Sequence, residues 1–242
     1  MIIAKEKIFY FHVPKTGGTT IEYFLGDLFN IHERNHTAFF NGFVAEIGPG
    51  GGTIFKCIVH LPYKKQLTMA ANSDIEIDNT WNIFTIVRNP YYRAMSAIFF
   101  QGVFGCKYHM HTLPTIIEKR KLFTGAYTSF FTTDPLVNDW WQHRTPQYKL
   151  LESNPVDNLP PYKIYKYESG LENILRDALN LDKDFKFNLK TANSIDGTFR
   201  TPKTDYNTLL TSGFIETVNE YYKEDFEMFN YEMLNPLDFP ED

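Results

Sequence analysis

Short apolar runs, each bounded by Pro, Gly or Asn, recur along the sequence. They are rich in aromatic and β-branched residues, a composition that indicates buried strands. Three of them lie at residues 7–13, 55–59 and 83–87, and an alternating segment at residues 163–167 resembles a fourth. These segments therefore predict the strands of a sheet.

Apolar residues at helical spacing lie between these runs. The spacing predicts helices at residues 19–29, 63–72, 90–99, 112–123, 168–181 and 214–229. Residues 132–161 are rich in Pro, Asn and Asp, and residues 188–208 are polar, so both predict irregular structure. Strands that alternate with helices favour an α/β fold, and we predict one domain over residues 1–242 with a P-loop-like central parallel sheet flanked by helices.

Two of these helices have recognisable start signals. Thr19 followed by Glu22 has the spacing of a capping box, which predicts that the first helix begins near Thr19. Asn89 followed by Pro90 predicts a helix that Asn89 caps and Pro90 opens.

Composition narrows the class of protein. The chain has 242 residues, of which 43% are hydrophobic, 17% aromatic and 22% charged, so we expect a globular core that is rich in rings. A net charge of −5 argues against a general nucleic-acid binder. Cys57 and Cys106 suit a reducing compartment. Because neither a targeting segment nor a membrane span is evident, we expect a cytoplasmic protein.

The clearest chemical signal stands between the first strand and the first helix. This segment, the Lys15 motif, reads Pro14-Lys15-Thr16-Gly17-Gly18-Thr19-Thr20. Glycines let backbone N–H groups approach a phosphate, and the following helix adds N–H groups and the positive end of its dipole. It is not a Walker A loop, because its lysine precedes the glycines. The alternative is an ordinary strand-to-helix turn.

A second segment, the Arg88 motif, follows the strand at residues 83–87. It reads Arg88-Asn89-Pro90-Tyr91-Tyr92-Arg93-Ala94-Met95-Ser96. Arg88 stands at the exit of a strand, where ligands of open α/β sheets collect. Because a guanidinium fork and a hydroxyl suit a second phosphate, we expect Arg88 and Ser96 to bind one. A surface ion pair is the alternative for Arg88.

Together the two motifs resemble the sulfotransferases that use 3′-phosphoadenosine-5′-phosphosulfate (PAPS). The wording of both motifs, and the ending Tyr222-x-x-Asp225-Phe226-x-x-Phe229-x-Tyr231, are most similar to the branch that includes carbohydrate O-sulfotransferases. The resemblance extends from residue 7 to about residue 232. It implies a 5′-phosphosulfate loop at Lys15, Thr16, Gly17, Gly18, Thr19 and Thr20, and a 3′-phosphate site at Arg88 and Ser96.

The resemblance also implies the chemistry. The sulfuryl group of PAPS would move to a hydroxyl acceptor, and Lys15 would stabilise charge on the leaving phosphate. His60 falls where family members often carry their base, and its reference pKa of about 6.5 suits that role. Glu46 and His36 are weaker candidates for the base. Family members need no catalytic metal, and no His pair here joins a metal-ligand motif.

Three segments carry weaker signals. Residues 140–147 resemble a family segment near the acceptor cleft, although core packing explains the two Trp equally well. Arg200 and Lys203 lie where a late family loop closes over the 3′-phosphate, although loop charges in solvent are an equal alternative.

The competing functions are a P-loop-type kinase, a non-catalytic nucleotide-binding module, and sulfation of an amine or phenol instead of a carbohydrate.

Overall fold

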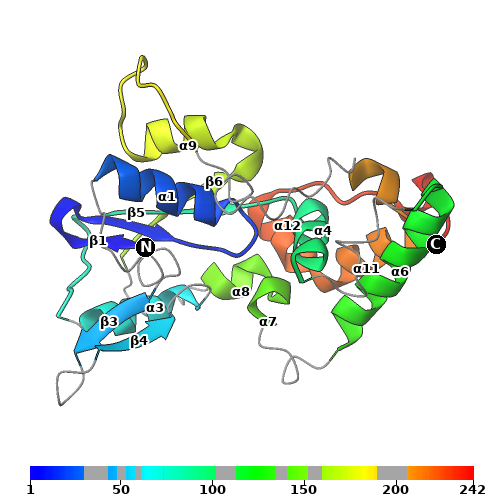
Figure 1. Ribbon diagram of the computed structural model, residues 1–242, viewed down its shortest axis with the longest axis horizontal. Coiled ribbons are helices and arrows are strands. Elements are labelled where there is room, and N and C mark those ends of the chain that lie inside the picture. The colour runs from blue at the N-terminus through cyan, green and yellow to red at the C-terminus, as the bar shows by residue number, and fades with distance from the viewer. Residues whose placement is uncertain are drawn as a thin grey trace. The chain divides into compact units, whose positions relative to one another are not determined.

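The structure is a computed structural model (Figure 1). It describes residues 1–29, 43–47, 53–57, 61–72, 74–101, 113–133, 141–151, 160–189 and 206–242. The described chain folds into two compact units, each built from two segments. Unit 1 comprises Met1–Val87 and Lys149–Asp196, and unit 2 comprises Arg88–Tyr148 and Gly197–Asp242. A single domain over residues 1–242 stays a prediction.

The central sheet belongs to unit 1. Its described strands are β1 (Ile2–Ile3), β2 (Ile8–Phe11), β5 (Asn82–Val87) and β6 (Lys163–Lys166), in the order β1-β2-β5-β6. β2, β5 and β6 are parallel, with Phe11 opposite Thr85 and Thr85 opposite Ile164, whereas β1 is antiparallel to β2. The carboxyl ends of β2 and β5 therefore lie at the same edge of the sheet.

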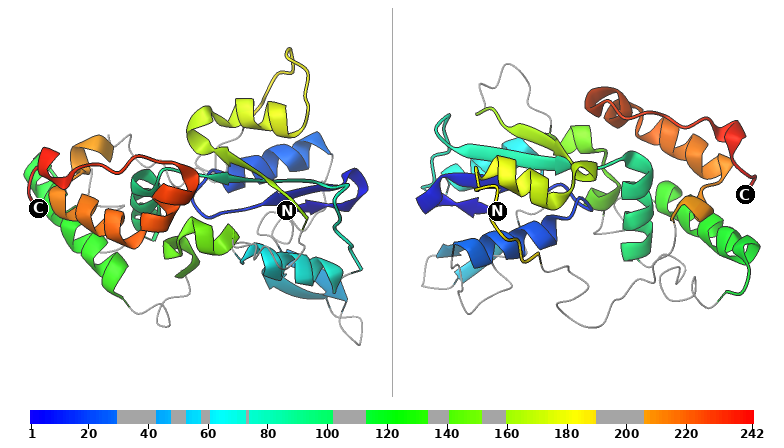
Figure 2. Two further views of the ribbon diagram at one scale, coloured as in Figure 1. Left: turned by 180° about the vertical axis from the view of Figure 1, so that it is seen from behind. Right: turned by 90° about the horizontal axis from the view of Figure 1, so that it is seen from above.

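Helices cover both faces of this sheet (Figure 1 and Figure 2). The helices are α1 (Gly18–Leu28), α3 (Tyr63–Ala71) and α9 (Leu171–Ala178), and the short helices η1 (Ala4–Glu6) and η5 (Tyr167–Ser169) flank the strands. Side chains of α1 and α9 form one buried cluster with alternate residues of β2 and β5, among them Tyr10 and Phe84. Tyr63 of α3 packs against the opposite face, where its ring stacks on Phe9 at 5.9 Å. The predicted α/β fold with a mostly parallel sheet flanked by helices is confirmed.

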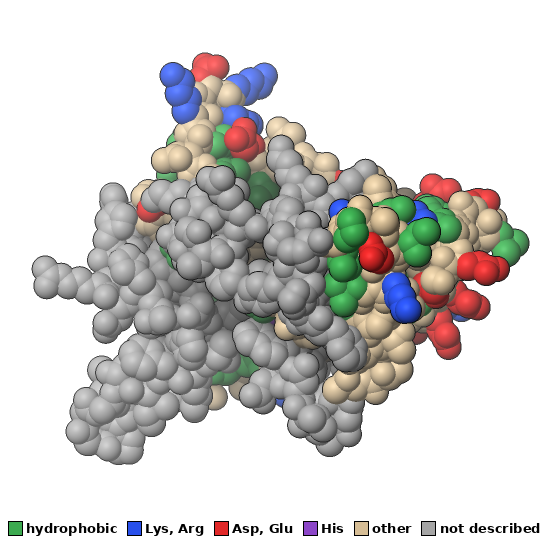
Figure 3. All heavy atoms as spheres, turned by 45° about the vertical axis from the view of Figure 1, so that its right-hand side comes forward, with side chains coloured by type: hydrophobic (Ala, Val, Ile, Leu, Met, Phe, Trp, Pro, Cys, Tyr) green, Lys and Arg blue, Asp and Glu red, His purple; other side chains and the backbone are tan. Residues whose placement is uncertain are grey.

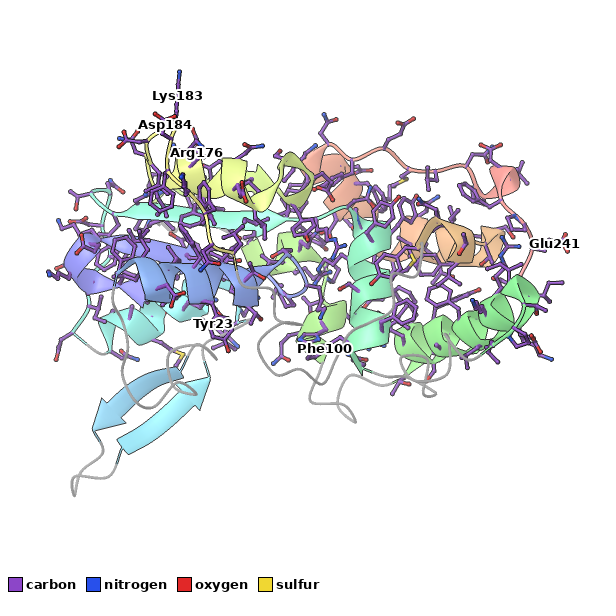
Figure 4. The ribbon with its side chains drawn as sticks, turned by 45° about the horizontal axis from the view of Figure 1, so that its top comes forward. Tyr23, Phe100, Arg176, Lys183, Asp184 and Glu241 are labelled. Atoms are coloured by element: carbon purple, nitrogen blue, oxygen red, sulfur yellow. The ribbon has the colours of Figure 1, made fainter. Side chains whose placement is uncertain are left out.

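One side chain secures the segment that follows α9. Arg176 donates to the carbonyl oxygens of Asp182 and Phe185 and lies 5.0 Å from the ring centre of Phe187. Lys183 and Asp184 lie at the tip of this segment (Figure 4). Arg176 therefore folds the segment back against its own helix.

The strand expected at residues 55–59 does not enter the central sheet. It forms β4 (Thr53–Cys57), which pairs antiparallel with β3 (Phe43–Ile47) in a separate two-stranded sheet. An apolar run predicts a strand but not its partner, and here the nearest segment along the chain supplies that partner.

Helices predominate among the described residues of unit 2. They are α4 (Pro90–Gln101), α6 (Ile116–Thr132), α7 (Trp141–Arg144), α8 (Gln147–Leu151, which crosses the unit boundary), η6 (Tyr206–Leu209), α11 (Ser212–Tyr221), α12 (Lys223–Phe229) and η7 (Pro236–Asp238). Buried side chains of α4, α6, η6, α11 and α12 form one aromatic core, in which Phe123, Tyr127 and Phe214 contact one another.

Three predictions about unit 2 need correction. The helix expected at residues 112–123 begins after Thr115, which forms a capping box with Glu118, and continues to Thr132. The supposedly irregular residues 132–161 contain α7 and α8. The single helix expected at residues 214–229 is two helices, because the chain leaves helical geometry at Tyr222 (φ −114°, ψ 25°).

Candidate functional site

The backbone of the Lys15 motif has the shape of an anion cradle. The angle φ is positive at Lys15 (68°) and at Gly17 (86°), but not at Thr16 between them. Alternation of this kind turns successive N–H groups toward one concave side, where an anion can accept from them. Thr16 is buried, and its hydroxyl donates to the carbonyl oxygen of Val13 at 2.7 Å. Thr16 would therefore meet an anion through its backbone N–H.

The cradle leads directly into the N-terminus of α1. The N-cap is Gly17, and no described side chain caps the helix there. The N–H groups of the first turn, Gly18 to Thr20, have no acceptor inside the helix, and the helix dipole adds positive potential at this point. The predicted capping box between Thr19 and Glu22 is wrong, because α1 begins at Gly18 and the Glu22 carboxylate is bound elsewhere.

That carboxylate belongs to a buried pair beneath the motif. Glu22 Oε1 lies 3.0 Å from Nδ1 of His12, and both side chains are buried. The His12 ring stacks on Tyr10 at 5.9 Å between ring centres. It also fills the space beside Gly18, where an added Cβ would stand 1.9 Å from Nε2 of His12. The pair thus supports the first turn of α1 from below.

The sequence analysis did not predict this pair, although the sequence contains a signal for it. His12 interrupts an apolar strand, and Glu22 interrupts the apolar face of the following helix. Buried charged groups are rare unless they are paired. Two such interruptions on either side of one loop therefore predict that the two side chains meet.

Gly17 packs against the side chains of Tyr167 and Leu171. An added Cβ at this position would stand 3.0 Å from the ring of Tyr167 and 3.3 Å from a methyl carbon of Leu171. Its positive φ is also a conformation that side chains disfavour. The backbone of the Lys15 motif is thus packed closely between β2 and the segment that opens α9.

The Arg88 motif lies in unit 2 and begins immediately after β5. As predicted, Asn89 caps α4: its Oδ1 accepts from the N–H of Tyr91 at 3.0 Å, and Pro90 is the first helical residue. Arg88 and Ser96 are both partly exposed. Ser96 lies about two turns along α4 from Asn89. Ser96 and Asn89 therefore lie on the same side of the helix.

A buried glutamine holds the backbone of Arg88. The Gln147 side chain accepts from the Arg88 N–H at 2.9 Å and donates to the Arg88 carbonyl at 2.9 Å. Gln147 is fully buried. Gln147 lies in the segment that resembles the family's acceptor region, but its amide binds the backbone of the Arg88 motif.

Several candidate residues lie outside the described part of the chain. These are His60, His36, Trp140, Arg200 and Lys203. The backbone of Glu46 lies in β3, and its side chain is outside the described atoms. The structure therefore brings together the residues of the Lys15 motif within unit 1, and those of the Arg88 motif within unit 2, and the base stays a prediction.

Two further observations concern the described residues alone. They contain no group of three or more His, Cys, Asp or Glu side chains that could hold a metal ion. No helix in the ranges given above is long and apolar enough to cross a bilayer.

Acidic side chains gather at the right of the surface in Figure 3. The exposed acidic residues of α11, α12 and the segment after them are Glu216, Glu220, Glu224, Glu227, Glu232, Asp238, Glu241 and Asp242. A net charge of −5 gives no long-range attraction for an anion. An anion would therefore have to be held by local groups, for which the Lys15 motif is the candidate.

Comparison with known proteins identifies the family. The model of the sulfotransferase family matches residues 1–232, which include both motifs and the C-terminal segment from Tyr222 to Tyr231. The chain belongs to the sulfotransferase family. Membership indicates a transferase that moves a sulfuryl group. Searches of curated proteins and of solved structures found no match to this sulfotransferase.

Proposed function

We propose that this sulfotransferase moves the sulfuryl group of PAPS to a hydroxyl group of a carbohydrate by in-line displacement. The observation that carries the proposal is the backbone of the Lys15 motif, where positive φ angles at Lys15 and Gly17 precede a helix N-terminus that no described side chain caps. This arrangement suits a multiply charged anion. The carbohydrate acceptor rests on the wording of the motifs, which resembles the carbohydrate O-sulfotransferase branch.

The residues of the Lys15 motif fit a 5′-phosphosulfate. The N–H groups from Gly17 to Thr20 would bind its oxygens, and the partly exposed Lys15 would lie beside the bridging oxygen. The donor supplies a sulfuryl group whose bond to a phosphate oxygen breaks as the acceptor oxygen attacks, so negative charge grows on the phosphate. Lys15 would stabilise that charge more strongly in the transition state than in the ground state.

Arg88 and Ser96 would hold the 3′-phosphate of the same donor. A guanidinium presents paired N–H groups that match phosphate geometry, and a serine hydroxyl adds one donor. The base that takes the proton of the acceptor hydroxyl is proposed to be His60, on the sequence argument above. A neutral imidazole could accept the proton as the acceptor oxygen bonds to sulfur.

The reaction is tested by incubating the protein with PAPS and a panel of carbohydrate, phenol and amine acceptors. The expected product is an acceptor whose mass increases by about 80 Da, the mass of one transferred SO₃ unit. A gain on phenols or amines alone would overturn the carbohydrate acceptor, and no gain on any acceptor with intact donor binding would favour a non-catalytic module.

The role of Lys15 is tested by Lys15→Ala. We expect turnover to fall by about 10²–10³-fold, the loss typical of one electrostatic donor that acts in the transition state. The affinity for the product 3′-phosphoadenosine-5′-phosphate (PAP) should fall far less. Lys5→Ala is the matched control, because Lys5 is an exposed residue of η1 before the other end of β2. A near-normal rate for Lys15→Ala would refute the assignment.

The role of Arg88 is tested by comparing two ligands. Arg88→Ala should weaken PAP binding by roughly 1.5–3 kcal/mol, the usual contribution of a charge-assisted contact. Binding of adenosine 5′-phosphate, which lacks the 3′-phosphate, should change little. Calorimetry that finds equal losses for both ligands would contradict the assignment.

A further inference from the structure

One amide side chain satisfies both backbone groups of Arg88. Gln147 accepts from the Arg88 N–H and donates to the Arg88 carbonyl, each at 2.9 Å. Two parallel hydrogen bonds fix the plane of the amide relative to the backbone of Arg88. They therefore restrict the direction in which the Cα–Cβ bond of Arg88 can point.

Gln147 is itself held by a carboxylate from the C-terminal part of unit 2. Asp225 of α12 accepts from the N–H of Gln147 at 2.9 Å and from the N–H of Tyr148 at 2.8 Å. Its Oδ2 also lies 3.4 Å from Nε2 of Gln147. Asp225 thus serves the first N–H groups of α8, where backbone donors have no partner inside the helix.

A buried arginine balances this carboxylate. Arg93 is attracted electrostatically to Asp225, donates to the carbonyl of Thr145 at 2.9 Å, and lies 5.8 Å from the ring centre of Tyr222. Tyr222 in turn donates to the carbonyl of Arg144 at 3.0 Å. Segment 144–148 is therefore anchored to α4 and α12 by buried polar contacts, which are costly to break.

We propose that Gln147 is a positioning residue for the anion site at Arg88. It holds the backbone of Arg88 so that the guanidinium meets the 3′-phosphate already oriented, and Asp225 holds Gln147. The inference rests on the proposed function of Arg88. A binding group that is held in place before the ligand arrives loses less entropy when it binds.

Glutamine suits this task better than its near relatives. Glutamate would accept from the Arg88 N–H but would present an oxygen to the Arg88 carbonyl. Methionine has a similar length but offers neither a strong donor nor a strong acceptor. Gln147→Met therefore removes both hydrogen bonds while retaining most of the volume.

The test measures 3′-phosphate selectivity, the ratio of the Kd for adenosine 5′-phosphate to the Kd for PAP. We expect Gln147→Met to lower this ratio by roughly 10–100-fold, as when supporting residues are removed around other binding groups. The loss should fall on PAP alone. In the Arg88→Ala background, Gln147→Met should lower PAP affinity by no more than about twofold further, because both changes remove one interaction.

Gln66→Met is the matched control. Gln66 is also a buried glutamine, and its amide donates to the carbonyl of Leu61 at 2.9 Å within unit 1. This variant should lose stability but keep the wild-type selectivity. If Gln147→Met does not fold, Asp225→Asn replaces it. Asp225→Asn retains one acceptor oxygen and should lower the selectivity in the same direction by a smaller factor.

The outcomes separate the inference from the proposed function. A loss of selectivity in Arg88→Ala with wild-type selectivity in the Gln147 or Asp225 variant overturns the inference alone. Equal weakening of both ligands in that variant also overturns it, because it indicates a purely structural role. Wild-type selectivity in Arg88→Ala overturns the assignment of Arg88, and the inference with it.

Discussion

Gly18→Ala tests the close packing beneath the Lys15 motif. Gly18 is the first residue of α1, and its φ is not positive, so its backbone would accept a side chain. Alanine is normally the better helix residue by about 0.8–1 kcal/mol. Here, however, the new Cβ would stand 1.9 Å, 2.1 Å and 2.3 Å from three atoms of the His12 ring. Real contacts of this kind are longer than 3 Å, so the ring or the helix must move.

The cost can be estimated from what the movement breaks. The His12 ring is buried and held by Glu22 at 3.0 Å, so a shift of more than 1 Å separates the pair. Overpacking costs about 1–3 kcal/mol, and a lost hydrogen bond to a charged group costs about 1.5–3 kcal/mol. After subtraction of the helix preference of alanine, we expect Gly18→Ala to lower the free energy of unfolding by about 2–5 kcal/mol.

The assay is urea unfolding of the wild type and the variants, followed by circular dichroism. Gly125→Ala in α6 is the control, because a Cβ there would have nothing within 4 Å. It should raise stability by up to about 1 kcal/mol. In a His12→Ala background the clash disappears, and Gly18→Ala should then be neutral or stabilising. Wild-type stability for the single Gly18→Ala variant would refute the reasoning.

Three further results are expected. Thr115→Ala removes the capping box of α6 and should cost about 0.5–2 kcal/mol of stability in urea unfolding, whereas Thr132→Ala on the exposed side of the same helix should cost less than about 0.5 kcal/mol. Burial raises the pKa of Asp225 above its ordinary value of 3.8, against the opposing effect of Arg93. The folded state therefore binds this proton more tightly than the unfolded state. The stability of the wild type, measured relative to Asp225→Asn, should fall as the pH rises from 3.8 through the raised pKa. A difference between the two proteins that stays constant with pH would contradict this. His60→Asn should reduce the rate by roughly 10²–10⁴-fold and abolish its rise with pH through the histidine pKa, and activity within a few-fold of wild type would exclude His60 as the base.

Local patterns predicted most of the elements that position the candidate site. The apolar runs at β2 and β5, the helical spacing of α1 and the Asn89-Pro90 start of α4 all depend on residues within one or two turns. The pairing of β4 with β3 and the break at Tyr222 depend on contacts that no local pattern encodes. The predicted capping box failed for a related reason, because the local preference of Glu22 was outweighed by a buried histidine ten residues away.

The residues that support the candidate site are harder to predict from the sequence than its candidate binding residues. Lys15, Gly17, Arg88 and Ser96 stand in two short motifs whose wording suggests phosphate chemistry. Gln147 lies 59 residues from Arg88 along the chain and binds its backbone. The type of neither side chain therefore indicates this contact. The contact between Gln147 and the backbone of Arg88 is therefore evident only in the folded structure.

The residues that hold the backbone of Arg88, Gln147 and Asp225, are synthesised at different times. Asp225 follows Gln147 by 78 residues, so at ribosomal rates of 5–20 residues per second it emerges roughly 4–16 seconds later. Until then, the N–H groups of Gln147 and Tyr148 lack the carboxylate that accepts from them in the folded chain, and closing so long a loop carries an entropic cost. We therefore expect the backbone of Arg88 to be held less firmly in the nascent chain until α12 docks and Asp225 binds Gln147.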